Sequence, residues 1–591
     1  MIRGFFGKVL HIDLTGSRYW VEEIQDEVFS SWLGGRGLGC YLLWRDLKPG
    51  VDALSADNII IFTTGPATAT TMWGASRYGV YSKSPLTNFF ADSYAGGSVA
   101  PQMKSCGYDA FVIHGASLSP VFLEISSQGV KSRDAADLWG KDIYETEDLC
   151  RKKVNVTGAQ TLAIGPAGEN LVRFATIGNN RWRNAGRTGM GAVMGSKKLK
   201  AIAFHGSEEP EIADKALLDR LVQELTDRGK NNPTVQRYRQ LGTPMIVAMT
   251  NAAGAFPTEY WSKGTLEGWE RISADALLSD FKVKPNACPR CFFACGKLTT
   301  VVEGRHQGLT IEGPEYETIY SFGGLCKILD LREIAYLNDI CDRLGLDTIT
   351  AGNLVAFCME LVKRGRLSAN IQYGHPDHAA ELVFDICRRE GLGNILAEGI
   401  RPASRVLKAE ELAVHVKGLE PAGYDPRMLK GMALGYATSP RGACHLPATF
   451  YIFELRGVFD PSAVKGKAES YIGWEDRLTI MDTMILCRFY RDMVGWPEMI
   501  TLLKATTGLD FSESRLKEIA NNISTLRRLI NLREGWKKED DMLPPRFFEE
   551  PVNGQRVIKE EFLYMLEEYY RLRGWNEQGR PLKVLGVEGW Q

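Results

Sequence analysis

The pattern of apolar and polar positions changes character near residue 210. Before it, short runs group β-branched and aromatic residues between Gly and Pro, which favours strands; the clearest runs are 7–14, 58–64 and 110–114. After it, apolar residues recur at three- and four-residue spacing, which predicts amphipathic helices; these segments are 214–227, 331–344, 354–363 and 515–532. We therefore expect an α+β protein, β-rich at first and mainly helical afterwards.

The chain has 591 residues, enough for about two to four domains and a large core. We place three domains, at 1–210, 211–415 and 416–591. No internal repeat or low-complexity segment interrupts them.

Composition narrows the classes of protein. The formal net charge is −1, so bulk electrostatics suggests neither a nucleic-acid partner nor a membrane surface. The first residues lack the apolar core of a secretion signal, and no uncharged apolar run reaches the roughly 18 residues that span a bilayer. The 12 cysteines lie mostly alone in apolar runs, as reduced core thiols do. We expect a cytoplasmic protein.

Three cysteines stand within eight residues: Cys288, Cys291 and Cys295. The spacing C-x2-C-x3-C lets one short loop direct three thiolates at a single soft metal centre. Cys487, in a short apolar run, is our candidate for the fourth ligand. Four thiolates would hold a [4Fe-4S] cluster.

Three other interpretations of this loop remain. Zinc also binds thiolates, but structural zinc usually pairs two C-x2-C knuckles, and this chain has one. A disulfide pair suits a reduced chain poorly. The loop could also be structural only.

Two glycine clusters lie in the β-rich part. One holds Gly96 and Gly97, and the other runs over 183–198 and includes Gly186. Dense glycines let backbone N–H groups approach an anion, and the neighbouring Arg and Lys supply countercharge, which favours a phosphate-bearing cofactor. Ordinary turns explain such runs about as often. The spacing fails the dinucleotide fingerprint, and we expect no strand before the second cluster.

Acidic residues border a helix boundary near residue 345. The helix over 331–344 should end at Gly345, and Asp347 or Thr348 can cap a helix that runs to about residue 363. An ordinary corner explains this pattern. The alternative is that Asp342 and Asp347 accept hydrogen bonds from the N–H groups of a heterocycle. The segment 482–487 has the same spacing, with Asp482 at the position of Asp342 and a cysteine at the position of Asp347.

Taken together, these segments resemble the tungsten-containing aldehyde:ferredoxin oxidoreductases along almost the whole chain. The matching stretches are 7–15, 34–37, 74–77, 183–200, 313–318, 288–295, 439–445 and 482–487. The resemblance implies an N-terminal domain of two β-sheets and two helical domains. A tungsten bis-pyranopterin would lie buried between them, beside one [4Fe-4S] cluster.

The resemblance also assigns roles to cofactor-binding residues. Cys288, Cys291, Cys295 and Cys487 would hold the cluster. Asp342 and Asp347 would bind one pterin and Asp482 the other. Arg77 and Arg183 would contact phosphate, and the backbone carbonyls of Tyr94 and Asn184 would bind a Mg²⁺ ion that bridges the two pterin phosphates.

For catalysis, the resemblance places Glu317 and His445 beside the metal. The pterin dithiolenes hold that metal, whether tungsten or molybdenum, so the protein need not supply a ligand. Glu317 is the candidate base for aldehyde oxidation because burial raises the pKa of a carboxyl group. His445 would hydrogen-bond the substrate oxygen.

Electrons from aldehyde oxidation leave a cluster one at a time. The expected acceptor is ferredoxin or an iron–sulfur partner subunit. Because the chain lacks a flavin or nicotinamide fingerprint, a separate subunit would bind any flavin or NAD.

One position departs from the family pattern. Members that dimerise through a bridging metal carry Glu-x-x-His, whereas this chain has Glu333 followed by Tyr336. We expect that bridge to be absent.

Two other functions stay open. A relative of the benzoyl-CoA reductase catalytic subunit would reduce an aromatic thioester, although Glu317 with His445 favours oxidation. A zinc-looped interaction protein would have no redox activity.

Overall fold

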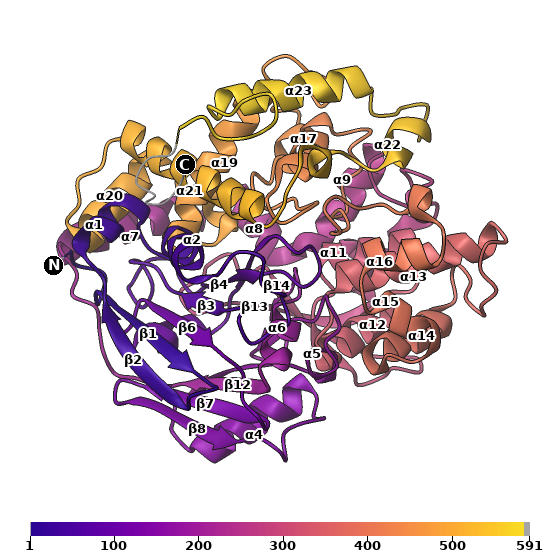
Figure 1. Cartoon of the computed structure of the whole chain (residues 1–591). Helices are drawn as coiled ribbons and strands as arrows, with labels where there is room; N and C mark the ends of the chain where they lie inside the picture. Colours follow the sequence, from indigo (N-terminus) through magenta and orange to yellow (C-terminus); the bar gives the residue numbers. More distant parts are fainter. Residues whose placement is uncertain (1, 584–591) are drawn as a thin grey trace.

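The computed structural model describes residues 2–583 (Figure 1). Its N-terminal part contains two six-stranded sheets. The first has the order β2-β1-β6-β3-β4-β5; the bounds are β1 Lys8–Asp13, β2 Arg18–Glu23, β3 Ile60–Thr63, β4 Tyr78–Lys83, β5 Phe90–Ala95 and β6 Ala110–His114. The three strand segments predicted from the sequence are β1, β3 and β6.

The second sheet has the order β11-β10-β9-β12-β7-β8. Its strands are β7 Val121–Ser126, β8 Gly129–Asp134, β9 Gln160–Ala163, β10 Ile177–Asn179, β11 Arg183–Ala185 and β12 Leu199–Phe204. Apolar side chains of the two sheets form one core; Phe111 of β6 and Phe204 of β12, for example, have ring centroids 5.2 Å apart. The first sheet is buried further by helix α2 (Gly35–Asp46), which packs on β3 and β4.

Helices dominate the rest of the chain, as the periodicity predicts. The predicted segments are α7 Lys215–Lys230, α12 Leu331–Leu344, α13 Thr348–Lys363 and α21 Glu513–Arg533. Gly345 ends α12 in the left-handed conformation with φ +78°, which a glycine adopts at little cost. The side chain of Asp347 caps α13 by accepting the N–H of Ile349. The corner between these helices is confirmed.

The structure contains one sheet that the sequence analysis did not predict, and one expectation about strands is wrong. A three-stranded antiparallel sheet lies within the helical part, made of β13 Phe281–Asn286, β14 Gly296–Val301 and β15 Thr310–Glu312. The alternation of exposed Lys282 and Lys284 about Val283 was its signal. The second glycine cluster is also preceded by a strand, the short β11. Three residues are too few for periodicity to reveal a strand.

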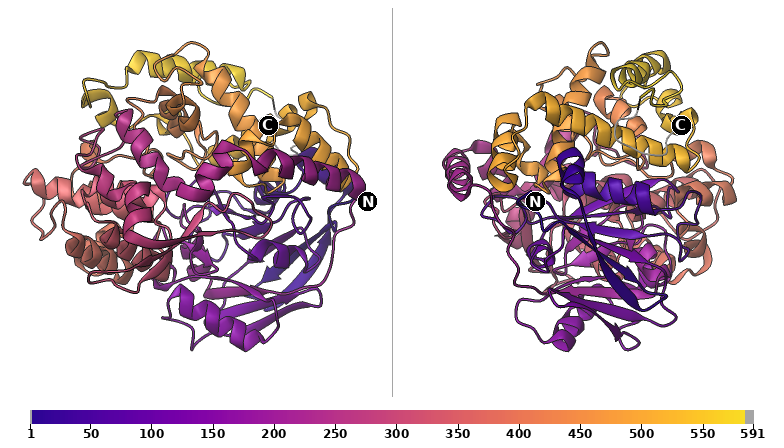
Figure 2. Two further views of the ribbon diagram at one scale, coloured as in Figure 1. Left: turned by 180° about the vertical axis from the view of Figure 1, so that it is seen from behind. Right: turned by 60° about the vertical axis from the view of Figure 1, so that its left-hand side comes forward.

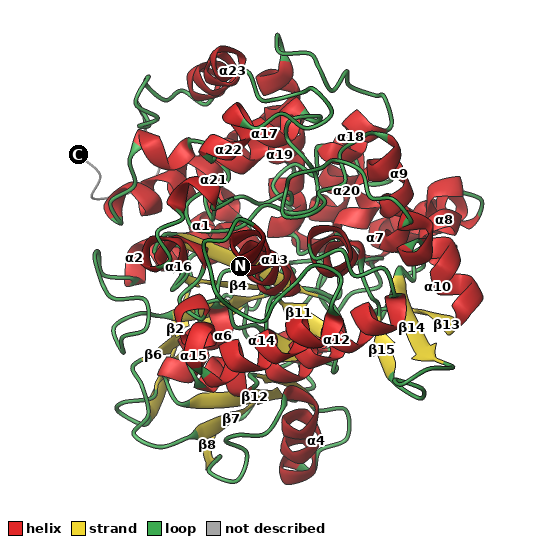
Figure 3. Cartoon of the chain, turned by 90° about the vertical axis from the view of Figure 1, so that its right-hand side faces the viewer, coloured by secondary structure: helices red, strands yellow, loops and turns green. Residues whose placement is uncertain are grey.

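The two sheets lie together at one side of the molecule, and the helices cover them from above and from the opposite side (Figure 1). The rear and rotated views show the same division (Figure 2). Figure 3 shows helices α12 and α14 (Pro376–Arg388) passing over the strands, with β13–β15 beside α10 (Ala274–Asp280). The predicted α+β class, β-rich first and helical afterwards, is confirmed. Within residues 2–583, no helix has the length and hydropathy to cross a membrane.

Candidate functional site

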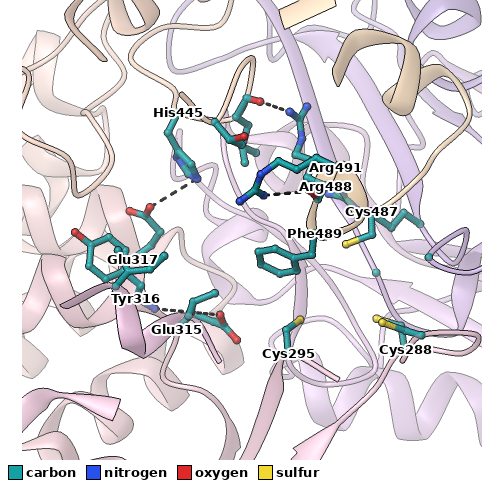
Figure 4. A pocket seen from close by; sticks show the side chains of 18 of the residues that line it. Cys288, Cys295, Glu315, Tyr316, Glu317, His445, Cys487, Arg488, Phe489 and Arg491 are labelled. Carbon is teal, nitrogen blue, oxygen red and sulfur yellow. Dashed lines mark hydrogen bonds and ion pairs between the residues drawn. The ribbon is translucent and has the colours of Figure 1, made fainter. Parts of the chain in front are cut away.

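A cavity of about 260 Å³ lies where the N-terminal sheets meet the helical part (Figure 4). All four candidate cysteines line it, and so do Glu317 and His445. These residues come from four separate segments of the chain. The fold therefore brings the predicted metal ligands and the predicted catalytic pair into one space.

The cysteine loop connects β13 to β14, and the pairing of Asn286 with Gly296 closes its base. The segment 74–76 fixes its tip: Ser76 Oγ donates to the carbonyl of Pro289 at 2.5 Å, and the N–H of Gly74 donates to the carbonyl of Arg290 at 2.8 Å. The carbonyl of Gly74 in turn accepts the N–H of Cys487 at 2.9 Å. One short segment thus holds both parts of the ligand set together.

The four candidate cysteines gather at one end of the first cavity. Across residues 2–583, no three His, Cys, Asp or Glu side chains converge closely enough for a single metal ion. The cysteines instead surround a shared space. Burial raises the pKa values of the Cys291 and Cys295 thiols, so a bound metal centre would be needed to keep them as thiolates.

Hydrogen-bonding groups lie next to the sulfurs of Cys288 and Cys291. The N–H of Gly97 donates to Cys288 Sγ at 3.4 Å, and Tyr490 Oη lies 3.7 Å from Cys291 Sγ. A Cβ on the neighbouring Gly96 would come within 2.9 Å of Cys288 Sγ. Gly96 is therefore required for the close approach of β5 to the cysteine loop.

A second cavity, also of about 260 Å³, adjoins the first. Glu315, Glu317, His445 and Leu446 line both. The residues predicted to bind cofactor divide between the two spaces. Arg77, Gly96 and Arg183 line the first; Tyr94, Asn184, Gly186, Asp342 and Asp347 line the second. The two spaces therefore adjoin at Glu317 and His445, which line both.

The two aspartates of the second cavity already have partners. Asn184 Nδ2 and Asn338 Nδ2 donate to Asp342 at 2.8 and 2.7 Å, and burial raises the pKa of this carboxyl well above its usual value. Asp347 pairs with Arg187 Nε at 2.9 Å. Burial thus favours the protonated form of Asp342 at the cavity wall, whereas Asp347 is paired with a guanidinium group.

Asp482 is not among the residues that line either cavity. It lies in α19 (Lys467–Thr483), where Oδ2 forms ion pairs with Arg36, at 2.6 Å, and with Arg488. Its Oδ1 is buried without a hydrogen-bond partner. Of the other predicted residues, Gly97 and Gly345 act through backbone and likewise lie outside both linings.

The sequence did not identify several buried arginines around these cavities. They are Arg36, Arg187, Arg441, Arg488 and Arg491. Arg36, Arg187 and Arg441 lie within the stretches 34–37, 183–200 and 439–445, which match the family pattern. That position in the sequence was their only indication of a functional role. Nε of Arg488 and Nε of Arg491 have no hydrogen-bond partner, although Nε of Arg491 lies 4.0 Å from Asp492 Oδ1. Buried guanidinium groups of this kind require anionic partners.

Glu317 lies on the short helix α11 (Tyr316–Thr318), directly before a π-helical turn over Ile319–Leu325. Its Oε2 accepts the N–H of Gly423 at 3.0 Å, and its Oε1 lies 3.7 Å from His445 Nε2. Burial raises the pKa of Glu317 to about 7, against the lowering effects of the Gly423 N–H and of Arg187. This carboxyl group can therefore gain and lose a proton near neutral pH.

His445 lies in the loop after α17 (Lys430–Thr438). Burial, and then the charges of Arg187, Arg441, Arg488 and Arg491, lower the pKa of its imidazole well below the usual value. The ring is neutral, and its Nδ1 has no protein partner. One ring nitrogen thus faces Glu317 while the other is free to contact a ligand.

Aromatic rings enclose the Glu317 side of the first cavity. Tyr424 stacks on Tyr451 with centroids 3.6 Å apart and lies 5.5 Å from the ring of His445. Tyr316 and Phe489 complete this lining. A small organic molecule could therefore contact apolar ring faces while a polar group reaches Glu317 and His445.

Comparisons with known proteins match the chain over most of its length. The family model for the aldehyde ferredoxin oxidoreductase N-terminal domain matches residues 9–206, and the model for domains 2 and 3 matches 220–585. The tungsten-containing aldehyde ferredoxin oxidoreductase of Pyrococcus furiosus is 37% identical and covers 99% of each chain.

More distant proteins match as well. The WOR-like subunit of the aliphatic sulfonate oxidoreductase of Pyrococcus furiosus is 31% identical over 98% of this chain and 97% of its own length. The BamBC active-site complex of benzoyl coenzyme A reductase, solved with 1,5-dienoyl-CoA, superposes with a TM-score of 0.86 at 24% identity and covers 98% of this chain and 96% of its own. At that identity the likeness shows the fold alone.

The two family models together span most of the chain, and the relatives match it along nearly its full length. The chain belongs to the aldehyde ferredoxin oxidoreductase family and is an oxidoreductase of that type.

Proposed function

We propose that this enzyme oxidises an aldehyde to a carboxylate and releases the electrons through a [4Fe-4S] cluster to a one-electron carrier. The balanced reaction is RCHO + H2O → RCOO⁻ + 3 H⁺ + 2 e⁻. The observation that supports this proposal most directly is that four cysteines and Glu317, whose carboxyl pKa is about 7, line the same cavity. One side suits proton removal and the other suits electron transfer.

A tungsten or molybdenum bis-pyranopterin would supply the two-electron acceptor. In this proposal Arg77 and Arg183 would hold its phosphates, and Asp342, Asp347 and Asp482 would accept hydrogen bonds from its pterin N–H groups. The carbonyls of Tyr94 and Asn184 are candidates for a Mg²⁺ ion between the phosphates. The buried atoms without partners, Asp482 Oδ1 and Arg488 Nε, support this assignment, because each needs a polar ligand atom.

In this mechanism Glu317 is the general base. As its carboxylate it takes a proton while the aldehyde carbon is oxidised, and the N–H of Gly423 keeps the other oxygen oriented. The neutral His445 donates an N–H to the substrate oxygen. Tyr424, Tyr451 and Phe489 exclude water from the substrate and position its apolar part.

Electrons would leave through Cys288, Cys291, Cys295 and Cys487. The acceptor is then ferredoxin or an iron–sulfur subunit, and a separate flavin or NAD subunit would serve any nicotinamide acceptor. The names of the relatives include both aldehyde and aliphatic sulfonate oxidoreductases, so the substrate is best identified with a panel of neutral and anionic aldehydes.

The test combines metal analysis with an activity assay on anaerobically purified protein. We expect one tungsten or molybdenum and about four irons per chain, together with viologen-linked oxidation of aldehydes. Zinc alone, without iron, would overturn the proposal. Reduction of an aromatic thioester without any aldehyde oxidation would establish the benzoyl-CoA reductase-like alternative.

A further inference from the structure

The cysteine loop reaches the protein surface at one turn. Cys288, Cys291 and Cys295 are partly buried, whereas Pro289 and Arg290 between them are exposed. Both line a groove of about 640 Å³. The first cavity lies on the inner side of this turn, and the groove lies on its outer side.

The wall between the two spaces is thin. Ser76 lines both the first cavity and the groove, and its hydroxyl donates to the carbonyl of Pro289. Cys288 and Cys291 flank the same turn. Because electron transfer slows steeply with distance, a carrier seated in this groove would lie close to the cluster ligands.

Arg290 occupies an unusual position on this turn. Its φ is +52°, in the left-handed region that glycine and asparagine occupy at lower cost. The backbone is held there because its carbonyl accepts the N–H of Gly74. Its exposed guanidinium forms no ion pair with any residue in the range 2–583. An exposed cation without an ion pair in the range 2–583, carried on a held backbone beside the cysteines, therefore lines the groove.

The rest of the groove resembles a small protein interface. Its floor is apolar and includes Met72, Ala75 and Leu218. The rim opposite Arg290 carries Glu209, Lys215 and Asp219, which are exposed and have no ion pair among residues 2–583. An apolar centre with a charged rim is the usual arrangement of a protein docking surface.

We propose that this groove is the docking site of a one-electron iron–sulfur protein whose surface, next to its own cluster, presents a carboxylate to Arg290. The proposal rests on the proposed electron exit through the cysteines. In each docking event the enzyme's cluster is oxidised by one electron and the carrier's cluster is reduced by one. Two reduced carriers therefore leave for each aldehyde oxidised.

Two pairs of variants test this proposal. Arg290→Asn removes the charge but suits the left-handed backbone, and Arg290→Lys keeps the charge. Ser105→Trp places a large ring in the groove from the end of α3 (Val99–Lys104), away from the cysteines, and Ser105→Ala is its matched control. Lys152→Asn removes another exposed cation without an ion pair, on α4 (Ile143–Val154), a helix at the far edge of the sheets (Figure 1).

The assay compares two acceptors on the same holoenzyme: ferredoxin from Pyrococcus furiosus and a small viologen dye. With ferredoxin, Arg290→Asn should raise the apparent KM about threefold or more and weaken its dependence on salt. Ser105→Trp should lower kcat/KM about tenfold or more by blocking contact. Arg290→Lys, Ser105→Ala and Lys152→Asn should match wild type, and viologen rates should not change.

Several results would overturn the proposal. Unchanged ferredoxin kinetics in both Arg290→Asn and Ser105→Trp would place the carrier elsewhere, and an equal loss in Lys152→Asn would indicate only bulk charge. If Arg290→Asn loses iron, its ferredoxin kinetics no longer test docking, and the result for Ser105→Trp alone decides whether the carrier binds in the groove. If the wild-type enzyme shows no activity with viologen, the proposed function itself is rejected. If the protein forms a dimer without ferredoxin and Ser105→Trp abolishes that dimer, the groove is a contact between two copies of this chain.

Discussion

The two ends of the first cavity are built differently. At the Glu317 end, carboxyl and imidazole groups lie among stacked tyrosines, and burial shifts both pKa values toward the neutral forms. At the cysteine end, hydrogen bonds from the Gly74 N–H and the Ser76 hydroxyl hold a hairpin loop whose tip reaches the surface. Burial suits proton transfer at neutral pH, because desolvation is the largest cause that raises the Glu317 pKa to about 7. Electron exit requires proximity to the surface.

The largest expected effect comes from removing a cysteine. Cys487→Ala should lose the cluster iron and abolish both viologen- and ferredoxin-linked turnover, since no neighbouring side chain can replace the thiolate. Cys358→Ala, a buried thiol on α13 outside both cavities, is the control. Iron content and activity decide the result. Full iron with normal turnover in Cys487→Ala would mean that another cysteine is the fourth ligand.

Glu317→Gln should act on the opposite end alone. The amide keeps the size of the side chain but cannot take a proton, so kcat should fall by about 10²- to 10⁴-fold. Metal and iron contents should stay at the wild-type level. Glu315→Gln is the matched control, because Glu315 lines the same cavity and is hydrogen-bonded to Thr243. Equal activity of Glu317→Gln and wild type would exclude Glu317 as the base.

His445→Asn should have a smaller effect. The shorter amide no longer reaches the substrate oxygen, and the loss of one hydrogen-bond donor at a developing negative charge costs about 10²-fold in kcat. The neutral imidazole moves no proton in this mechanism. Combining both substitutions in one variant would measure their coupling, which should be clear because the two side chains lie 3.7 Å apart.

The pH dependence distinguishes the two ends without mutating the cysteines. A base must be deprotonated, so kcat/KM should rise with pH through the Glu317 pKa of about 7 and be about tenfold below its plateau at pH 6. His445 is already neutral in this range and adds no second limb. The rising limb should disappear in Glu317→Gln. If it persists there, another group takes the proton.

The smallest effect is expected at Glu333. Its carboxylate accepts from Arg305 at 2.8 and 2.6 Å and lies 3.0 Å from His306, whose ring stacks on Tyr336. Glu333→Gln should therefore leave turnover, iron content and oligomeric state unchanged. Size-exclusion chromatography and iron analysis are the measurements. Iron clearly above four per chain in wild type, lost in this variant, would show a bridging metal after all.

The sequence alone determined the local features. The C-x2-C-x3-C spacing predicted a converging loop, periodicity predicted α7, α12, α13 and α21, and Gly345 with Asp347 predicted the corner between two helices. Each of these depends on contacts within a few residues, so spacing carries the information. The order of motifs along the whole chain also identified the family.

Only the tertiary structure decided how distant segments combine. Glu317 and His445 are 128 positions apart, and their approach depends on how α11 and the loop after α17 pack. The partners of Asp482, the arginines around the cavities and the outer groove behind Arg290 have the same origin. The pKa of Glu317 also depends on burial by residues from the whole fold. Such long-range packing leaves no periodic trace in the sequence, because each contact is set by the complete chain.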